Sequence, residues 1–187
     1  MNPAGRLRNG LHYGWIILVV ATLVAFGALG LARFGYSVLL PAMQADLGMG
    51  NTEAGFLATA HVIGYLVASL IGGALASRFG PRRVITVGLA IAGSSMLMTG
   101  LAGDYAEIAL WRGLAGVGSG MSNIPIYGVL AAWFGTRRRG LATGIAVSGA
   151  SVAFIALGPL VPIVLDEFGT LGWRICWYGF GGFTIFL

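Results

Sequence analysis

Lysine is absent from the sequence, cysteine occurs once, and charged residues make up only 9% of its 187 positions. A soluble domain carries about 25% charged residues, so this composition argues against a water-soluble fold. Cys176 lies within an apolar run and has no partner, which excludes a disulfide framework and a thiolate metal site. The two histidines are isolated and the acids lie in loops or at the ends of apolar runs, so we expect no enzyme activity, no metal and no cofactor.

Hydrophobic residues occupy 57% of the chain and form long continuous runs. A helix needs about 20 apolar residues to cross the hydrocarbon core of a lipid bilayer, and transmembrane strands would show alternating polarity instead. We therefore predict an all-α, polytopic transmembrane helix bundle. Gly116 and Gly120 form a GxxxG pair, a spacing that lets helices approach closely. The expected spans lie near residues 15–40, 54–76, 84–101, 105–134 and 141–165, and a short sixth near 173–187 suggests a fragment.

Arginines fall in short clusters in every second connection between the apolar runs. By the positive-inside rule these connections are cytoplasmic, so we expect a multi-pass protein of the bacterial inner membrane with a cytoplasmic N-terminus. The formal net charge of +5 would suggest nucleic acid as the partner of a soluble protein, but separate clusters lack the continuous basic face that such binding needs. The clusters comprise Arg6, Arg8, Arg78, Arg82, Arg83, Arg137, Arg138 and Arg139, and the intervening regions hold Asp46, Glu53, Asp104, Glu107, Asp166 and Glu167.

Three basic residues lie inside predicted spans, namely Arg33, His61 and Arg112. A charged side chain in the membrane interior costs at least about 2.5 to 3.5 kcal/mol on insertion scales, and by default it faces a cavity or a partner. Counted from the outer ends of their spans, the three residues share one layer about 12 Å deep. Snorkelling of Arg33 toward the interface and a backbone partner for His61 are the plainer alternatives.

Polar residues recur at helical spacing beside these basic groups. No acid lies deep in any predicted span, so a bound anion is the group that could neutralise the two arginines. His61 could supply a titratable proton site in the same layer. The predicted substrate-binding residues are Arg33, Arg112, His61, Tyr65, Ser119, Asn123 and Tyr127.

Two stretches resemble signatures of the major facilitator superfamily of transporters. Gly73-Ala-Leu-Ala-Ser-Arg-Phe-Gly-Pro-Arg-Arg83 is similar to G-x-L-x-D-R-x-G-x-R, and Arg112-Gly-Leu-Ala-Gly-Val-Gly-Ser-Gly120 is similar to R-x-x-x-G-x-G-x-G. Ser77 departs from the first signature, in which an aspartate belongs to a cytoplasmic gating network. The resemblance implies a gating turn formed by Gly73, Ser77, Arg78, Gly80, Arg82 and Arg83, and a further cytoplasmic loop with Arg137, Arg138 and Arg139.

This resemblance implies the N-terminal six-helix half of a transporter, built from inverted three-helix repeats, whose partner is the C-terminal half of the same protein. It implies secondary active transport of a small solute by alternating access, through symport or antiport. Together with the basic layer, it leads us to expect an organic anion such as a carboxylate, with proton coupling or exchange. Two alternatives stay open, which are proton-coupled efflux of hydrophobic or drug-like compounds and a non-transporting membrane sensor or truncated product.

Overall fold

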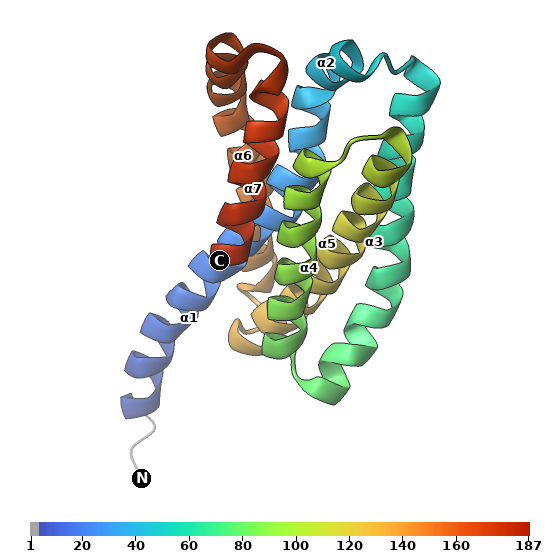
Figure 1. The fold of residues 1–187 in the computed structure, drawn as a ribbon. Coiled ribbons are helices and arrows are strands. Elements are labelled where there is room, and N and C mark those ends of the chain that lie inside the picture. Colours follow the sequence, from blue (N-terminus) through green and yellow to red (C-terminus); the bar gives the residue numbers. More distant parts are fainter. Residues whose placement is uncertain (1–3) are drawn as a thin grey trace.

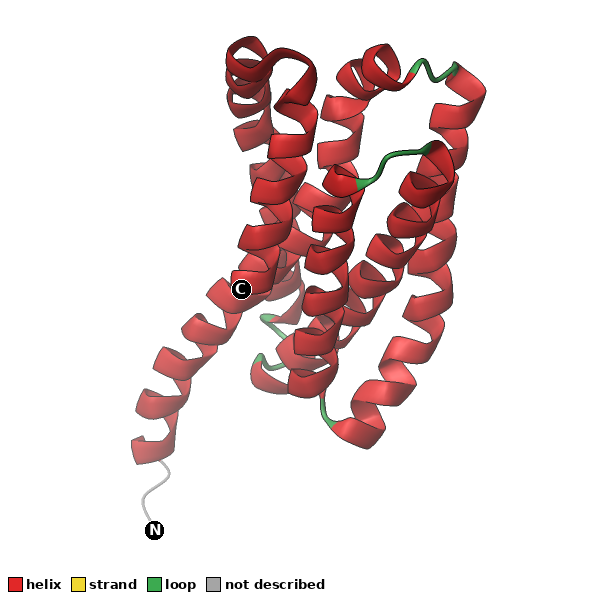
Figure 2. Ribbon diagram, in the orientation of Figure 1, coloured by secondary structure: helices red, strands yellow, loops and turns green. Residues whose placement is uncertain are grey.

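The computed structural model describes residues 4–187, with side chains from residue 13 onward, and every regular element among them is a helix (Figures 1 and 2). The predicted all-α class is therefore confirmed. The predicted cytoplasmic N-terminus rests partly on Arg6 and Arg8, whose side chains lie outside the described residues. The elements are α1 (Ala4–Ala25), η1 (Phe26–Phe34), α2 (Gly35–Leu47), α3 (Asn51–Phe79), α4 (Pro81–Leu101), α5 (Tyr105–Trp133), α6 (Arg139–Phe168), η2 (Gly169–Leu171) and α7 (Gly172–Phe186).

The first three elements form one continuous helical rod. The sequence placed the end of this span near residue 40. The structure carries the helix through Pro41 to Leu47, and it ends where Gly48 adopts a left-handed conformation with φ +64°. A proline removes one backbone donor, but neighbouring helices and local adjustments tolerate this loss within a membrane span.

Four helical stretches are long and apolar enough to cross a membrane, namely Tyr13–Leu47, Asn51–Phe79, Pro81–Leu101 and Arg139–Phe186. The last of them contains both α6 and α7, joined by the short η2. Helix α5 is 29 residues long but is not among the four. It carries the buried Arg112 and Asn123, and it lies between α3 and α4 in the bundle. Its polar residues are therefore directed toward other helices.

Glycines allow α5 to touch both neighbours with its backbone. Gly116 lies against the carbonyl of His61 in α3, and Gly118 lies against Gly88 and Ala92 in α4. Gly120, the second glycine of the GxxxG pair, lies against the carbonyl of Tyr65 in α3. The close approach inferred from that spacing is confirmed, because a Cβ added at Gly116 or Gly120 would lie too close to backbone atoms of α3. Helix α6 packs in turn against α1 and η1 of the first span, and α7 packs against α4.

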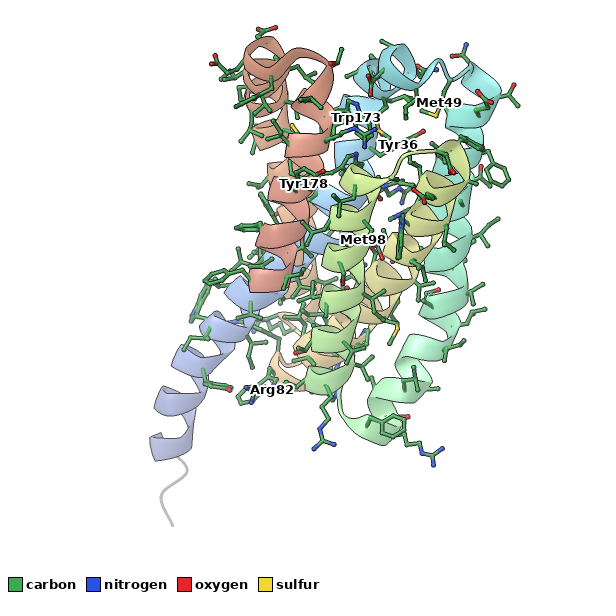
Figure 3. The ribbon with its side chains drawn as sticks, viewed as in Figure 1. Tyr36, Met49, Arg82, Met98, Trp173 and Tyr178 are labelled. Carbon is green, nitrogen blue, oxygen red and sulfur yellow. The ribbon has the colours of Figure 1, made fainter. Side chains whose placement is uncertain are left out.

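The charged residues separate to the two ends of the bundle. One end, which we call the arginine end, holds the start of α1, the α3–α4 turn and the α5–α6 turn (Figure 1). Arg82 extends from this end, whereas Met49 and Trp173 lie near the opposite one (Figure 3). The opposite end, which we call the acidic end, holds the connections around residues 48–50, 102–104 and 169–171, beside which all six acids of the chain lie.

Several of these acids satisfy free amides at helix starts. Asp104 accepts a hydrogen bond of 2.8 Å from the amide of Glu107, and Glu107 accepts one of 2.9 Å from the amide of Gly103. Asp104 is thus the N-cap residue of α5, and the two bonds together satisfy two backbone amides at the start of this helix. On the C-terminal side of α4, Arg174 donates to the carbonyls of Gly100 and Ala102, which have no partners within the helix.

Asp46 ties the end of α2 to the start of α7, because its Oδ2 accepts a 2.9 Å hydrogen bond from Nε1 of the buried Trp173. Asp46→Ala leaves that indole donor without its partner, so we expect the free energy of unfolding to fall by about 1 to 3 kcal/mol. Unfolding of the full-length protein in detergent measures the change. Asp46→Asn keeps an acceptor oxygen and should retain most of the stability. Equal losses in both variants would show that the hydrogen bond does not hold the two helices together.

Candidate functional site

Arg112 of α5 lies enclosed in the acidic-end half of the bundle and is 1% exposed. Its Nη1 donates a 2.6 Å hydrogen bond to the carbonyl oxygen of Ala32 in η1. The guanidinium carbon lies 4.4 Å from the ring centre of Tyr36 and 5.4 Å from that of Trp177, so an aromatic face from α2 and one from α7 stabilise the charge. Arg112 therefore connects three spans and is enclosed by protein.

The carbonyl that receives Arg112 belongs to a nine-residue π-helix, η1. The wider turn is visible at its end, where the amide of Gly35 donates to the carbonyl of Gly30, five residues earlier. Stretches of π-helix are rare, and they occur frequently at functional sites. In this protein the irregular backbone is buried against α5 and α6, and Arg112 supplies an extra donor to it.

His61 of α3 is 1% exposed and lies beside the backbone of Arg112. Neither ring nitrogen forms a hydrogen bond of normal geometry among the described residues, but the Arg112 backbone lies close enough to act on the imidazole, so the plainer alternative of a backbone partner stays open. The charges of Arg112 and Arg33 both act on the imidazole, which places the three predicted basic residues in one electrostatic neighbourhood.

Arg33 has the opposite environment to Arg112. It is the eighth residue of η1, in the interior of the continuous first span, and its side chain is exposed. Ser37, one turn further along, is exposed as well. The sequence presents the two arginines as equivalent charges in one layer, but the structure buries one inside this bundle and leaves the other on its surface.

A hydrogen-bonded chain of three side chains joins α3 to α5. Nδ2 of the buried Asn123 donates to the hydroxyl of Tyr65 at 3.1 Å, and the hydroxyl of Tyr127 donates to Oδ1 of Asn123 at 3.4 Å. Both tyrosines are half-buried. Ser119, the remaining predicted binding residue, is fully buried and donates to the carbonyl of Ala115 in its own helix, so its hydroxyl proton is not free.

The residues of the predicted gating turn lie at the arginine end. Helix α3 ends at Phe79 and α4 begins at Pro81, with Gly80 between them at φ +87°, a conformation that favours glycine. Ser77 donates to the carbonyl of Ala74, and the exposed Arg78 stacks on the ring of Phe79. The other members of the predicted turn and loop are also exposed, namely Gly73, Arg82, Arg83, Arg137, Arg138 and Arg139.

The structure thus gathers the predicted residues into two groups. The first group lies in the acidic-end half and consists of Arg33, His61 and Arg112. The second group lies further toward the arginine end and consists of the hydrogen-bonded Tyr65, Asn123 and Tyr127. Tyr36 and Trp177 also belong to the site, although the sequence reasoning omitted them. Tyr36 lies three residues after Arg33, and that spacing was the signal that could have identified it. The searched residues contain no group of three His, Cys, Asp or Glu side chains that could hold a metal ion.

Comparison with known proteins identifies the family of this chain. The family model described as Major Facilitator Superfamily matches residues 18–187, which is nearly the whole chain. The chain belongs to the major facilitator superfamily. The family resemblance inferred from the two signatures is therefore confirmed, and the apolar helices are those of a multi-pass membrane protein.

Two curated relatives illustrate the similarity. Human monocarboxylate transporter 11 is 29% identical over 186 residues, which cover 99% of this chain and 38% of that protein. The probable sulfoacetate transporter SauU of Cupriavidus necator is 30% identical over 161 residues, which cover 85% of this chain and 36% of that protein. The chain thus spans less than two-fifths of the length of these two relatives.

A solved superfamily structure shows the same fold. The partially occluded inward-open conformation of the xylose transporter XylE from E. coli superposes with a TM-score of 0.78 at 17% sequence identity. The superposition covers 93% of this chain and 48% of that chain. The predicted fold, an all-α bundle like part of a superfamily transporter, is confirmed by this superposition.

Proposed function

We propose that the protein containing this chain is a secondary active transporter of a small organic anion, which it moves by alternating access with proton coupling or exchange. The observation that carries the proposal is Arg33, an exposed guanidinium in the interior of a membrane span. Contact with hydrocarbon would cost at least about 2.5 to 3.5 kcal/mol, so this surface is best explained as the wall of a water-filled path.

The sign of the charge in this layer supports an anionic solute. Arg33 lies with His61 and Arg112, while all six acids of the chain lie at the acidic end. A carboxylate or sulfonate accepts paired hydrogen bonds from a guanidinium, which is the strongest match for an arginine without an acidic partner among the residues that the structure describes. The two curated relatives are named for a monocarboxylate and for sulfoacetate, and both are small organic anions.

The two arginines have separate tasks in this proposal. Arg33 contacts the solute, and His61 takes part in proton coupling. Arg112 acts through the first span, because its Nη1 donates to the Ala32 carbonyl and its guanidinium faces two aromatic rings. It holds η1, and with it Arg33, in position, and its charge adds to the attraction of the solute anion.

The charge asymmetry of the two ends supports an orientation. We place the arginine end, and with it the N-terminus, in the cytoplasm of a bacterial inner-membrane protein, as the positive-inside rule predicts. The turn around Gly80 and the exposed arginines at this end then lie where a cytoplasmic gate against the other half of the protein would form. Ser77 places a neutral side chain at that gate, so electrostatic attraction between the two halves of the protein would come from the arginines there.

Uptake by the full-length protein in proteoliposomes tests the proposal. Radiolabelled lactate, pyruvate, acetate and sulfoacetate should enter, whereas neutral lactamide should not. Arg33→Gln should reduce anion uptake by at least about tenfold, because it removes a charge-assisted hydrogen bond. Ser37→Ala is the matched control, since Ser37 is exposed on the same span one turn away and carries no charge.

Two results would contradict the proposal. One is wild-type uptake of every tested anion by Arg33→Gln, and the other is no uptake of any of them by the wild type. In the second case, extrusion of a hydrophobic dye that persists in Arg33→Gln would favour proton-coupled efflux instead.

A further inference from the structure

The chain Tyr65–Asn123–Tyr127 has a direction as well as a position. Asn123 is 1% exposed, so its amide depends on protein partners. Its nitrogen donates to the Tyr65 oxygen at 3.1 Å, and its oxygen accepts the proton of Tyr127 at 3.4 Å. One amide therefore fixes the roles of two tyrosine hydroxyls on two helices.

The two hydroxyls are left with opposite capacities. A tyrosine hydroxyl has one proton to donate and lone pairs that accept. The Tyr65 oxygen accepts from Asn123, and its own proton has no acceptor among the described residues. The proton of Tyr127 is used by Asn123, so this hydroxyl offers lone pairs only. An anion, which only accepts hydrogen bonds, is matched by Tyr65 and repelled by Tyr127.

Depth does not distinguish the two tyrosines. Their hydroxyls bond to the two ends of one Asn123 amide, so they lie at a similar depth in the bundle. The direction of the two hydrogen bonds distinguishes them, because only the Tyr65 hydroxyl keeps a proton to donate. The free hydroxyl proton therefore selects Tyr65.

We propose that Tyr65 donates the hydrogen bond that orients the anionic group of the solute, and that Asn123 is a positioning residue that keeps the Tyr65 proton free. This inference rests on the proposed transport of an organic anion. It makes the polar chain directional, with the anionic group of the solute at Tyr65 and with Tyr127, whose proton is used by Asn123, outside contact with the solute.

A pair of isosteric variants tests the direction. Tyr65→Phe and Tyr127→Phe each remove one hydroxyl from the same chain, and the full-length protein in proteoliposomes is assayed with whichever of lactate, pyruvate, acetate and sulfoacetate the wild type takes up fastest. We expect Tyr65→Phe to raise KM by about tenfold or more, because a hydrogen bond to a charged group is lost. Tyr127→Phe should change KM by less than about threefold, since its proton never reaches the solute. A melting curve in detergent confirms that both variants are folded.

Asn123→Ala tests the positioning role by a double-mutant cycle. With the amide removed, both tyrosine hydroxyls can rotate, so the difference in KM between Tyr65→Phe and Tyr127→Phe should disappear in the Asn123→Ala background. A residue that only supported the fold would leave that difference unchanged.

The outcomes separate this inference from the function on which it rests. If the wild type takes up an anion and Arg33→Gln abolishes uptake, while Tyr65→Phe has no effect on KM, the role of Tyr65 is wrong and the proposed function stands. A large effect of Tyr127→Phe alone would show that the amide faces the other way, which overturns the stated direction. If the wild type takes up none of the four anions, both proposals fail.

Discussion

Replacing Gly116 with alanine should prevent α5 from packing against α3. An added Cβ would overlap the carbonyl oxygen of His61 and would lie 2.9 Å from its carbonyl carbon. These are backbone atoms of a neighbouring helix, so no side chain can rotate to make room. Overpacking of this kind costs about 3 kcal/mol, and here the helices would also move apart along the site that contains His61. The expected result is a large loss of monodisperse full-length protein after extraction in detergent.

The matched control is Gly128→Ala on the same helix. A Cβ at Gly128 meets nothing within 4 Å, so this variant tests the same substitution without the overlap. Alanine is favoured over glycine within a helix by about 1 kcal/mol, so the control should be as stable as the wild type or more stable. Similar yields of the two variants would contradict the close backbone contact between α5 and α3.

Arg112→Ala should both destabilise the protein and abolish transport. The change removes the donor to the Ala32 carbonyl and the cation that lies between Tyr36 and Trp177. A hydrogen bond from a charged group contributes about 1.5 to 3 kcal/mol, and a desolvated cation–π contact about 2 kcal/mol. Relief of the buried charge offsets part of this sum, so we expect a net loss of about 3 kcal/mol in SDS-induced unfolding of the full-length protein.

Two further variants separate charge from shape. Arg112→Lys keeps a positive charge but lacks the planar group that stacks on two rings, so it should recover only part of the stability. Arg112→Met fills the volume without a donor and leaves the Ala32 carbonyl without this partner. Full stability of Arg112→Met would contradict the role of Arg112 as a support for η1, and anion uptake by that variant would contradict its role in positioning Arg33.

The fold and family could be predicted from the sequence because their causes are carried by many residues. Long apolar runs require helices in lipid, and the alternating arginine clusters set the connections on one end of the bundle. The signatures that begin at Gly73 and Arg112 added the family. Position along a helix largely sets depth, so counting residues was enough to predict that Arg33, His61 and Arg112 lie near one another.

The contrasting environments of the two arginines could not be predicted in this way. Counting residues gives depth, but it does not give the direction in which a side chain points when the helix departs from 3.6 residues per turn. No residue between Phe26 and Phe34 marks a wide turn in the sequence. The N-cap role of Asp104 could also have been predicted from the sequence, because aspartate directly before an apolar helical run is a favoured N-cap.

The wide turn of η1 has a consequence for how this protein should be aligned with other members of its superfamily. In a regular α-helix each residue advances the rotation by about 100°, so one extra residue turns everything after it to another face unless the backbone widens to absorb it. A member with an unbroken α-helix in this span would need a one-residue gap opposite residues 26–34 to bring equivalent side chains to the same face. Without that gap, Arg33 would be aligned with a residue on a different face of the helix. A comparison of substrate preferences at that position would then compare residues that do not face the same part of the protein.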